Sequence, residues 1–166
     1  MLEEPTEKTS LSKPFCFYYR MLSEDEATSN SLNSQQYQTH VKKIASFSTV
    51  EDFWGIFQHL KKPDSCPPGV GFYLFKDDIK PLWEEESHRQ GGRISFKLKK
   101  NFTSVLWEEI VRRNFNLKVM AFIGDVLPQD LAEEITGIIV SVKGEFNVIQ
   151  FWVKDFNNKD HINSLK

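Results

Sequence analysis

The sequence predicts an α+β domain in which an antiparallel sheet carries helices on one face. Short aromatic or alternating apolar segments recur along the chain with turn-forming residues between them, and two segments with helical spacing interrupt the series. Strands with short connections usually pair in antiparallel order, with helices packed on one side. The 166 residues, 40% of them apolar, are enough for one domain with its own core.

Six segments are predicted to be strands because β-branched and aromatic residues dominate them. The segment at 13–21 (KPFCFYYRM) is strongly aromatic, whereas the segment at 94–100 (ISFKLKK) alternates apolar with polar or charged residues. The last two segments flank a turn at 143–147 that contains glycine and asparagine. In chain order the predicted strands are 13–21, 41–47, 70–75, 94–100, 135–142 and 148–153.

Two segments have the apolar spacing of amphipathic helices. The first is predicted at 49–60, where Ser48 and Glu51 have the spacing of a capping box and a proline-rich run follows the end. Its apolar positions are Phe53, Trp54, Phe57 and Leu60. The second helix is predicted at 103–123, and its apolar stripe is Leu106, Ile110, Leu117 and Met120.

Polar segments mark the loops and one end of the predicted domain. Residues 1–12 are polar and are expected to form a disordered tail, with a single domain at 13–166. The Ser/Asn/Glu-rich segment at 22–36 has little to bury and is expected to be a mobile loop. A long charged loop at 76–92 contains one tryptophan.

Composition excludes several classes of function. A net charge of -2 argues against a broad duplex-binding surface, although a protein that reads one nucleotide need not be basic. Cys16 and Cys66 are too few for a disulfide scaffold or a zinc ribbon. No histidine lies in a metal or nucleophile motif, so neither an enzyme nor a cofactor or metal is expected. Without a signal peptide or a long apolar run, the cytoplasm is expected, with the nucleus as the alternative.

The strongest local signal for chemistry is Trp83, followed by three glutamates at 84–86 in the charged loop. An indole can stack on guanine while a neighbouring carboxylate accepts hydrogen bonds from the Watson–Crick edge of the base. A guanine methylated at N7 carries positive charge, which adds a cation–π interaction. From the residues alone, the more frequent outcome is that Trp83 folds back onto the domain and the glutamates form a solvated run.

Each of the other candidate residues has two interpretations. Tyr37 follows the polar loop and is either a strand-edge packing residue or a second stacking ring. Arg93 and Lys143 lie near strand ends and are either surface charges or phosphate ligands. Trp54 is either a core residue or an exposed anchor for a helical partner. Trp152, at a strand end, either packs in the core or touches a ligand.

Six segments carry a resemblance to a known family: STVEDFWGIFQHL (48–60), YLFKDDIKPLWEEE (73–86), GGR (91–93), IGD (123–125), TGIIVSVKG (136–144) and IQFW (149–152). Together they resemble the eukaryotic translation initiation factor 4E family of mRNA cap-binding proteins. The resemblance implies a curved antiparallel sheet with helices packed on the convex face and the ligand on the concave side. The segment SQQYQTHVKKIASF (34–47) is most similar to the 4E homologous protein class, which is linked with translational repression.

The resemblance also implies roles for individual residues. The two rings that stack on the cap are Tyr37 and Trp83, the carboxylate that reads guanine is Glu84, and the tryptophan near the methyl group is Trp152. The phosphate-binding residues are Arg93 and Lys143. The surface that receives helical partners contains Val50, Trp54, Glu109 and Gly124.

The chain departs from the family pattern at four places. An insert is expected at 112–119, and KTSLSK stands where the family has a His-Pro segment. Glu145 and Val148 occupy positions that carry lysines in the main class, so weaker triphosphate binding is expected. The chain ends at Lys166, so the domain is expected to be incomplete at its C-terminus relative to the family.

Taken together, these observations predict a monomeric protein that binds the 7-methylguanosine cap of mRNA and regulates translation initiation. It would act as an initiation factor or as a cap-competing repressor. A scaffold protein or a 4E-binding-type protein would dock on the convex face through a helical motif. The alternative is a protein-interaction module, a shortened isoform with weak or no cap binding.

Overall fold

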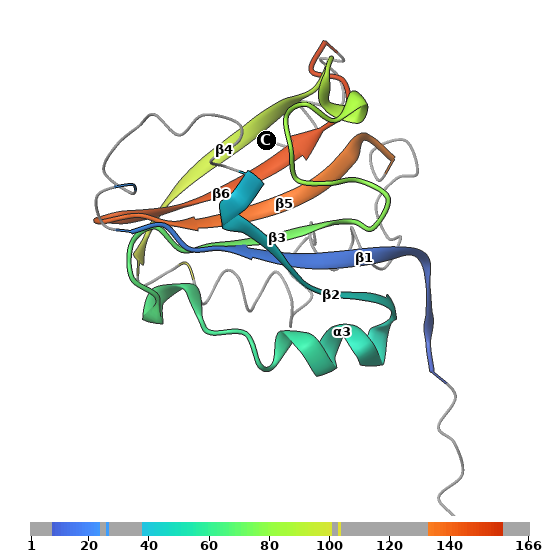
Figure 1. Ribbon diagram of the computed structural model, residues 1–166, viewed down its shortest axis with the longest axis horizontal. Coiled ribbons are helices and arrows are strands. Elements are labelled where there is room, and N and C mark those ends of the chain that lie inside the picture. The colour runs from blue at the N-terminus through green and yellow to red at the C-terminus, as the bar shows by residue number, and fades with distance from the viewer. Residues whose placement is uncertain (1–7, 24–25, 27–37, 101–102, 104–132, 158–166) are drawn as a thin grey trace, which may run out of the picture.

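The computed structural model describes residues 8–23, 26, 38–100, 103 and 133–157, and within them six strands form one antiparallel sheet (Figure 1). The strand order across the sheet is β2-β1-β3-β5-β6-β4. This sheet confirms the predicted fold class. The elements are β1 (Ser10–Arg20), β2 (Val41–Thr49), α3 (Val50–Phe57), η1 (Pro63–Ser65), β3 (Gly71–Lys76), η2 (Glu86–His88), β4 (Gly92–Lys99), β5 (Ile135–Val142) and β6 (Phe146–Val153).

The predicted strands all exist, and all but β5 have shifted ends. β5 has its predicted bounds, whereas β1 begins at Ser10, so 10–12 belong to the strand and not to the predicted disordered tail. Ser10 pairs with Thr49 of β2, and the regular pairing of the two strands resumes at Phe15. Several predictions fall outside the described residues: Tyr37, Glu109, Gly124, most of the loop at 22–36, nearly all of the helix at 103–123, and the insert at 112–119.

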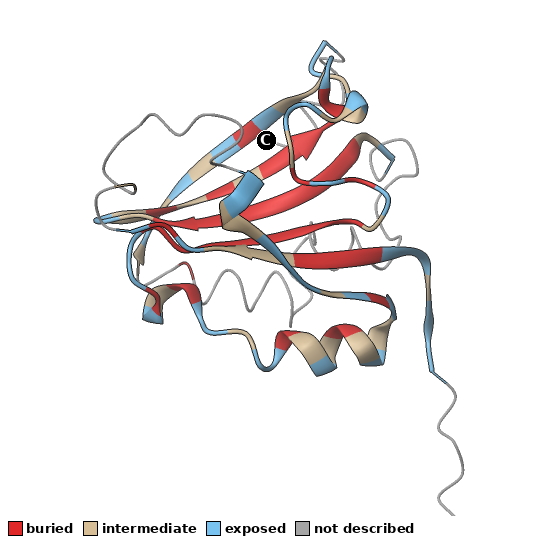
Figure 2. Cartoon of the chain, viewed as in Figure 1, coloured by how far each residue is buried: buried red, intermediate tan, exposed pale blue. Residues whose placement is uncertain are grey.

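The two central strands, β3 and β5, are buried along their whole length because both faces of the sheet are covered there (Figure 2). Successive side chains in a strand point to opposite faces. Phe72 and Leu74 therefore join the apolar cluster under α3, and Tyr73 and Phe75 join a second cluster on the other side. We call these sides the helix face and the pocket face.

The helix face is held together mainly by phenylalanine rings. Phe53 and Phe57 of α3 lie one turn apart and stack with ring centroids 5.4 Å apart. Phe53 is fully buried and also packs on Phe17 of β1 and Phe47 of β2, at 5.7 and 5.3 Å. Burial of such rings contributes most of the favourable free energy of packing. This packing fixes α3 on the convex face of the sheet.

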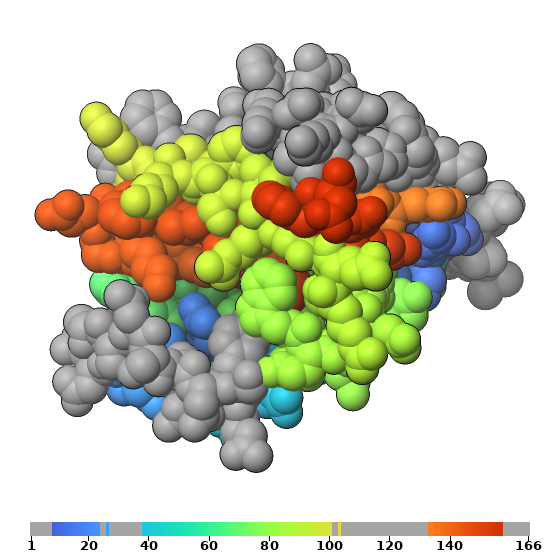
Figure 3. All heavy atoms as spheres, turned by 90° about the horizontal axis from the view of Figure 1, so that it is seen from above, coloured from blue at the N-terminus to red at the C-terminus, as the bar shows by residue number. Residues whose placement is uncertain are grey.

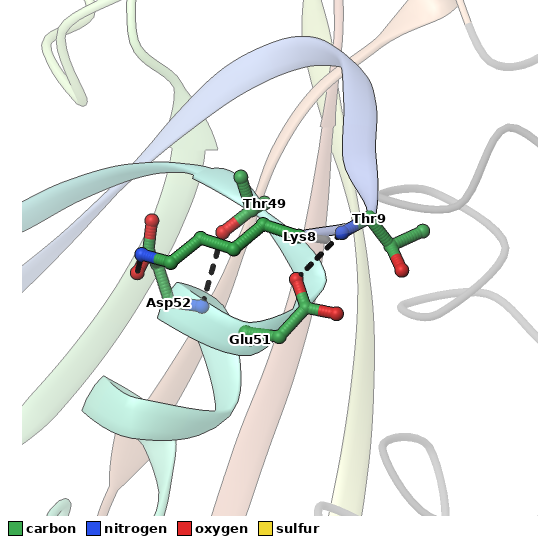
Figure 4. A network of polar contacts seen from close by, with 5 residues as sticks. All are labelled: Lys8, Thr9, Thr49, Glu51 and Asp52. Atoms are coloured by element: carbon green, nitrogen blue, oxygen red, sulfur yellow. Dashed lines mark hydrogen bonds and ion pairs between the residues drawn. The ribbon is translucent and has the colours of Figure 1, made fainter. Parts of the chain in front are cut away.

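The start of α3 differs from the predicted capping box. Thr49, not Ser48, is the N-cap, and its hydroxyl oxygen accepts a hydrogen bond from the backbone N–H of Asp52 at 3.2 Å (Figure 4). The Glu51 carboxylate accepts instead from the backbone N–H of Thr9, at 2.9 Å, and Lys8 pairs with Asp52. The predicted pattern is displaced by one residue because strand pairing of β2 continues through Thr49.

Candidate ligand-binding site

A pocket of about 280 Å³ opens on the pocket face, between β5, β6 and the loop at 77–91. Figure 3 looks onto this side of the molecule, where atoms of the loop (green) meet those of β4 (yellow-green) and β6 (orange). Aromatic rings and cationic side chains share the lining. The described residues that line the pocket are Arg20, Tyr73, Trp83, Arg93, Ile139, Ser141, Lys143, Val148, Gln150 and Trp152.

Two tryptophan rings pack against each other at the pocket. Trp83 of the loop is 40% exposed, whereas Trp152 of β6 is 2% exposed. Their ring centroids are 3.8 Å apart and their planes are inclined by 23°, so the rings are stacked. Trp83 thus folds back onto the domain, as the local alternative predicted, yet much of its ring stays open to solvent. The buried indole N–H of Trp152 has no hydrogen-bond partner among the described residues.

The loop that carries Trp83 is shaped by its own backbone hydrogen bonds. The N–H of Leu82 donates to the carbonyl of Lys80 at 2.8 Å, and the single turn η2 closes with the N–H of Arg89 donating to the carbonyl of Glu86 at 3.2 Å. After η2, the N–H of Gly91 donates to the carbonyl of His88 at 3.0 Å. Gly91 is needed because a Cβ atom there would lie 2.3 Å from the Val153 carbonyl oxygen. The close approach of Gly91 to β6 brings the loop over the sheet.

His88 ties this loop to the sheet below it. Its Nδ1 atom lies 2.7 Å from the carbonyl oxygen of Leu82, and its Nε2 atom lies 3.0 Å from the hydroxyl oxygen of Thr136. The hydroxyl oxygen of Thr136 also lies 3.1 Å from the carbonyl oxygen of Trp152. Burial lowers the pKa of His88 below its ordinary value of 6.5, which favours the neutral ring.

Three of the described side chains that line the pocket are cationic. Arg93 lies opposite Trp152 in the β4–β6 pairing, and its guanidinium carbon is 5.5 Å from the centre of the Trp83 ring. Lys143 follows β5, and its backbone N–H donates to the side chain of buried Asn147. Burial, and then the charge of Arg20, lower the pKa of Lys143. An anion in the pocket would offset both effects, so the site is suited to negatively charged groups.

The structure brings together four of the residues predicted for the ligand: Trp83, Trp152, Arg93 and Lys143 all line the pocket. Glu84 is exposed beside Trp83 and is not among the described lining residues, and Tyr37 lies outside the described residues. Val50 and Trp54 lie on α3, across the sheet from the pocket. The residues that the sequence analysis missed are Arg20, Tyr73, Ile139, Ser141 and Gln150.

Among the described residues no helix has the length and apolar character needed to cross a membrane. The same part of the chain contains no cluster of three or more side chains able to hold a metal ion.

Comparison with solved structures shows the same architecture. The structure of Ascaris suum eIF4E-3 in complex with the m2,2,7G cap superposes with a TM-score of 0.76 at 27% identity, over 96% of this chain and 82% of that one. A schistosome eIF4E, solved with m7GpppA and 4E-BP, has a TM-score of 0.78 at 24% identity, over 95% and 78% of the two chains, which supports the fold alone.

Sequence comparison gives the same result. The rice (Oryza sativa subsp. japonica) protein "Eukaryotic translation initiation factor NCBP" is 32% identical over 133 residues, which cover 80% of this chain and 54% of that protein. Drosophila melanogaster "Eukaryotic translation initiation factor 4E1" is 32% identical over 130 residues, or 76% and 46% of the two chains. The chain thus spans about half the length of these relatives. The family model for eukaryotic initiation factor 4E matches residues 10–166, and this chain accordingly belongs to the eukaryotic initiation factor 4E family.

Proposed function

We propose that this chain binds the 7-methylguanosine cap of mRNA in the pocket beside Trp83 and thereby acts in translation initiation. The observation that carries the proposal is a partly exposed indole stacked over a pocket that also holds three cations. Aromatic rings stack on bases and cations bind phosphates, so this combination suits one nucleotide with a phosphate chain. Family membership supports the same ligand.

The charge of a methylated base would favour its binding at Trp83. One face of the Trp83 ring is stacked on Trp152, so a base would stack on the opposite face. A stacked base contributes about 1–3 kcal/mol. The positive charge of 7-methylguanine adds a cation–π contribution of about 0.5–2 kcal/mol, so the methylated base would be preferred.

We further propose that Glu84 reads the base. Its carboxylate is exposed, and Glu84 directly follows the stacking residue Trp83 in the chain. Guanine offers N1–H and N2–H donors to such an acceptor. Adenine does not present this pair of donors, which would make Glu84 the residue that selects guanine.

The phosphate chain is assigned to Arg93 and Lys143, with Arg20 as an added candidate. All three side chains line the pocket, and the lowered pKa of Lys143 reflects burial and the nearby charge of Arg20. Phosphate oxygens would supply the missing negative charge. Val148 also lines the pocket, where the main class carries a lysine, so these three cations would carry the phosphate interaction.

Two parts of the proposal lie beyond the pocket. Tyr37, outside the described residues, is proposed as the second stacking ring. On the helix face, Val50 and Trp54 are proposed to receive the helical motif of a scaffold or 4E-binding-type protein, together with Glu109 and Gly124. Trp54 is half-buried and packs edge-on against Phe53 and Phe57, at 5.3 and 5.8 Å. The protein would act without catalysis, as a monomer in the cytoplasm.

Titration of tryptophan fluorescence with a 7-methylguanosine cap analogue tests the cap proposal. We expect saturable quenching, with weaker binding of the unmethylated analogue. Trp83→Ala should weaken binding at least ~10-fold because it removes the stacking ring. Trp54→Phe, on the opposite face, is the matched control and should leave the affinity unchanged. Equal affinity for the two analogues, or undiminished binding by Trp83→Ala, would contradict the proposal.

A further inference from the structure

His88 is the buried polar residue beneath the loop that carries Trp83. Its side chain is 4% exposed, although the residues on either side of it, Ser87 and Arg89, are more open to solvent. The imidazole ring meets both tryptophans edge-on. Its centroid is 4.9 Å from that of Trp152, at 81° between planes, and 6.4 Å from that of Trp83, at 67°.

The hydrogen bonds of His88 define which ring nitrogen carries a proton. The carbonyl oxygen of Leu82 can only accept, so Nδ1 must be the donor in the 2.7 Å contact. In the neutral ring Nε2 then has no proton and accepts from the hydroxyl of Thr136, which lies 3.0 Å away. One neutral histidine therefore links the residue just before Trp83 to β5.

The protonated ring would change this arrangement. Nε2 would then donate to Thr136, and the single hydroxyl proton of Thr136 would be left for the carbonyl of Trp152, 3.1 Å away. Among the described residues, the charged group that acts on the ring is Glu85 of the same loop, whereas Phe75 of β3, Thr136 of β5 and Trp152 of β6 present neutral groups. Burial therefore dominates and favours the neutral form.

We propose that His88 is a positioning residue for the base-binding tryptophan: it holds the backbone in front of Trp83 to β5 and keeps the Trp83 ring over Trp152. Its effect on the ligand rests on the proposed cap binding. A loop fixed in this way avoids part of the entropy cost of ordering Trp83 when a base binds. A protonated His88 would also place a positive charge near a positively charged base, so acid should weaken cap binding.

The first test needs no ligand. Two indoles stacked at 3.8 Å couple their electronic transitions and give a paired positive and negative band in the far-ultraviolet circular dichroism spectrum. We expect His88→Ala to reduce this signal while the protein stays folded, and His88→Asn to keep it because the amide offers one donor and one acceptor. Trp83→Phe is the control that defines complete loss of the signal. An unchanged signal in folded His88→Ala would overturn the proposal.

The second test uses the cap analogue. We expect His88→Ala to weaken binding about 3–10-fold and His88→Asn to restore most of the affinity. As the pH falls from about 7.5 to 5, the cap affinity of the wild type should decrease more than that of His88→Asn. Protonation changes of the ligand and of Glu84 affect both proteins alike, so they cancel in this comparison. Parallel pH profiles would overturn the proposed effect of charge.

The two readouts separate this proposal from the proposed function. If the wild type does not bind the cap analogue but His88→Ala still loses the indole signal, cap binding fails and the positioning role of His88 stands. If His88→Ala does not fold, Thr136→Val replaces it, because this change removes the partner of Nε2 and leaves the histidine in place. Thr136→Val should also reduce the indole signal, and an unchanged signal there would count against the proposal.

Discussion

The two faces of the sheet are both built from aromatic rings, but they use them differently. On the helix face, Phe17, Phe47 and Phe53 pack on one another in a cluster of apolar side chains. On the pocket face, Trp83 and Trp152 stack beside cations and a histidine that is hydrogen-bonded on both sides of its ring. Rings among apolar neighbours serve stability, whereas a ring left open among charges can serve binding. Substitutions on the two faces should therefore have different effects.

The largest effect is expected for Phe53→Ala on the helix face. Phe53 is fully buried and contacts rings from β1, β2 and α3, so its removal should leave a cavity that the surrounding rings cannot fill. We expect a loss of about 3–5 kcal/mol in the free energy of unfolding, measured by urea denaturation. Ile44→Ala, at an exposed position of β2, is the control and should change stability little. A loss below ~1 kcal/mol for Phe53→Ala would show that this cluster does not carry the fold.

The same substitution of glycine by alanine should have opposite signs on the two faces. At Gly91, in the pocket loop, the new methyl group would meet the backbone carbonyls of Val153 and His88, at 2.3 and 3.2 Å. Neither can move without displacing the loop, so we expect a loss of about 1–3 kcal/mol. At Gly55, inside α3, nothing lies within 4 Å, and alanine should stabilise the helix by about 0.5–1 kcal/mol.

Thermal and urea unfolding of both variants measure this difference. Gly91→Ala should also weaken cap-analogue binding, since the loop positions Trp83, whereas Gly55→Ala should not. If both variants were equally stable, the close approach of Gly91 to β6 would not be what holds the loop over the sheet.

The helix face could be predicted from the sequence because its signals are local. The spacing of Phe53 and Phe57 indicates one side of a helix, and the β-branched residues along 135–142 indicate a strand, without knowledge of the partner segments. The predicted N-cap, Ser48, lies one residue before the observed one, Thr49. Both residue types are good caps, and the strand pairing that decides between them is not local.

The pocket face depends on contacts that sequence spacing does not contain. Trp83 and Trp152 were connected only through the family resemblance, and Arg20 was missed because its place depends on the pairing of β1 with β3. The position of His88 under the loop could not be predicted, since its partner Thr136 lies 48 residues further along the chain.

A smaller effect is expected at the start of α3, where two polar contacts lie side by side (Figure 4). Thr49→Ala removes the hydroxyl that accepts from the N–H of Asp52, and we expect a loss of about 1 kcal/mol in urea denaturation. Lys8→Ala removes an ion pair whose side chains are 58% and 43% exposed, and solvent screening should leave its loss unmeasurable. A larger loss for Lys8→Ala than for Thr49→Ala would mean that the exposed pair, and not the cap, holds this end of the helix.

The smallest effect is expected in the pH dependence of stability, and it belongs to the pocket face. Because burial lowers the pKa of His88 in the folded chain below 6.5, the unfolded chain binds more protons at a pH between the two values. Stability contributed by the neutral ring is therefore fully present above pH 6.5 and falls as the pH drops toward the folded pKa.

Urea denaturation of the wild type and of His88→Asn at a series of pH values measures this contribution, since acidic side chains shared by the two proteins affect both alike. The wild type should lose more stability than His88→Asn below pH 6.5, and the two should run parallel above it. The opposite sign, with the wild type gaining on the variant in acid, would mean that the folded chain favours the charged ring. In that case the Thr136 hydroxyl would donate to the Trp152 carbonyl in the native protein, and the link beneath Trp83 would be an imidazolium donating at both of its nitrogens.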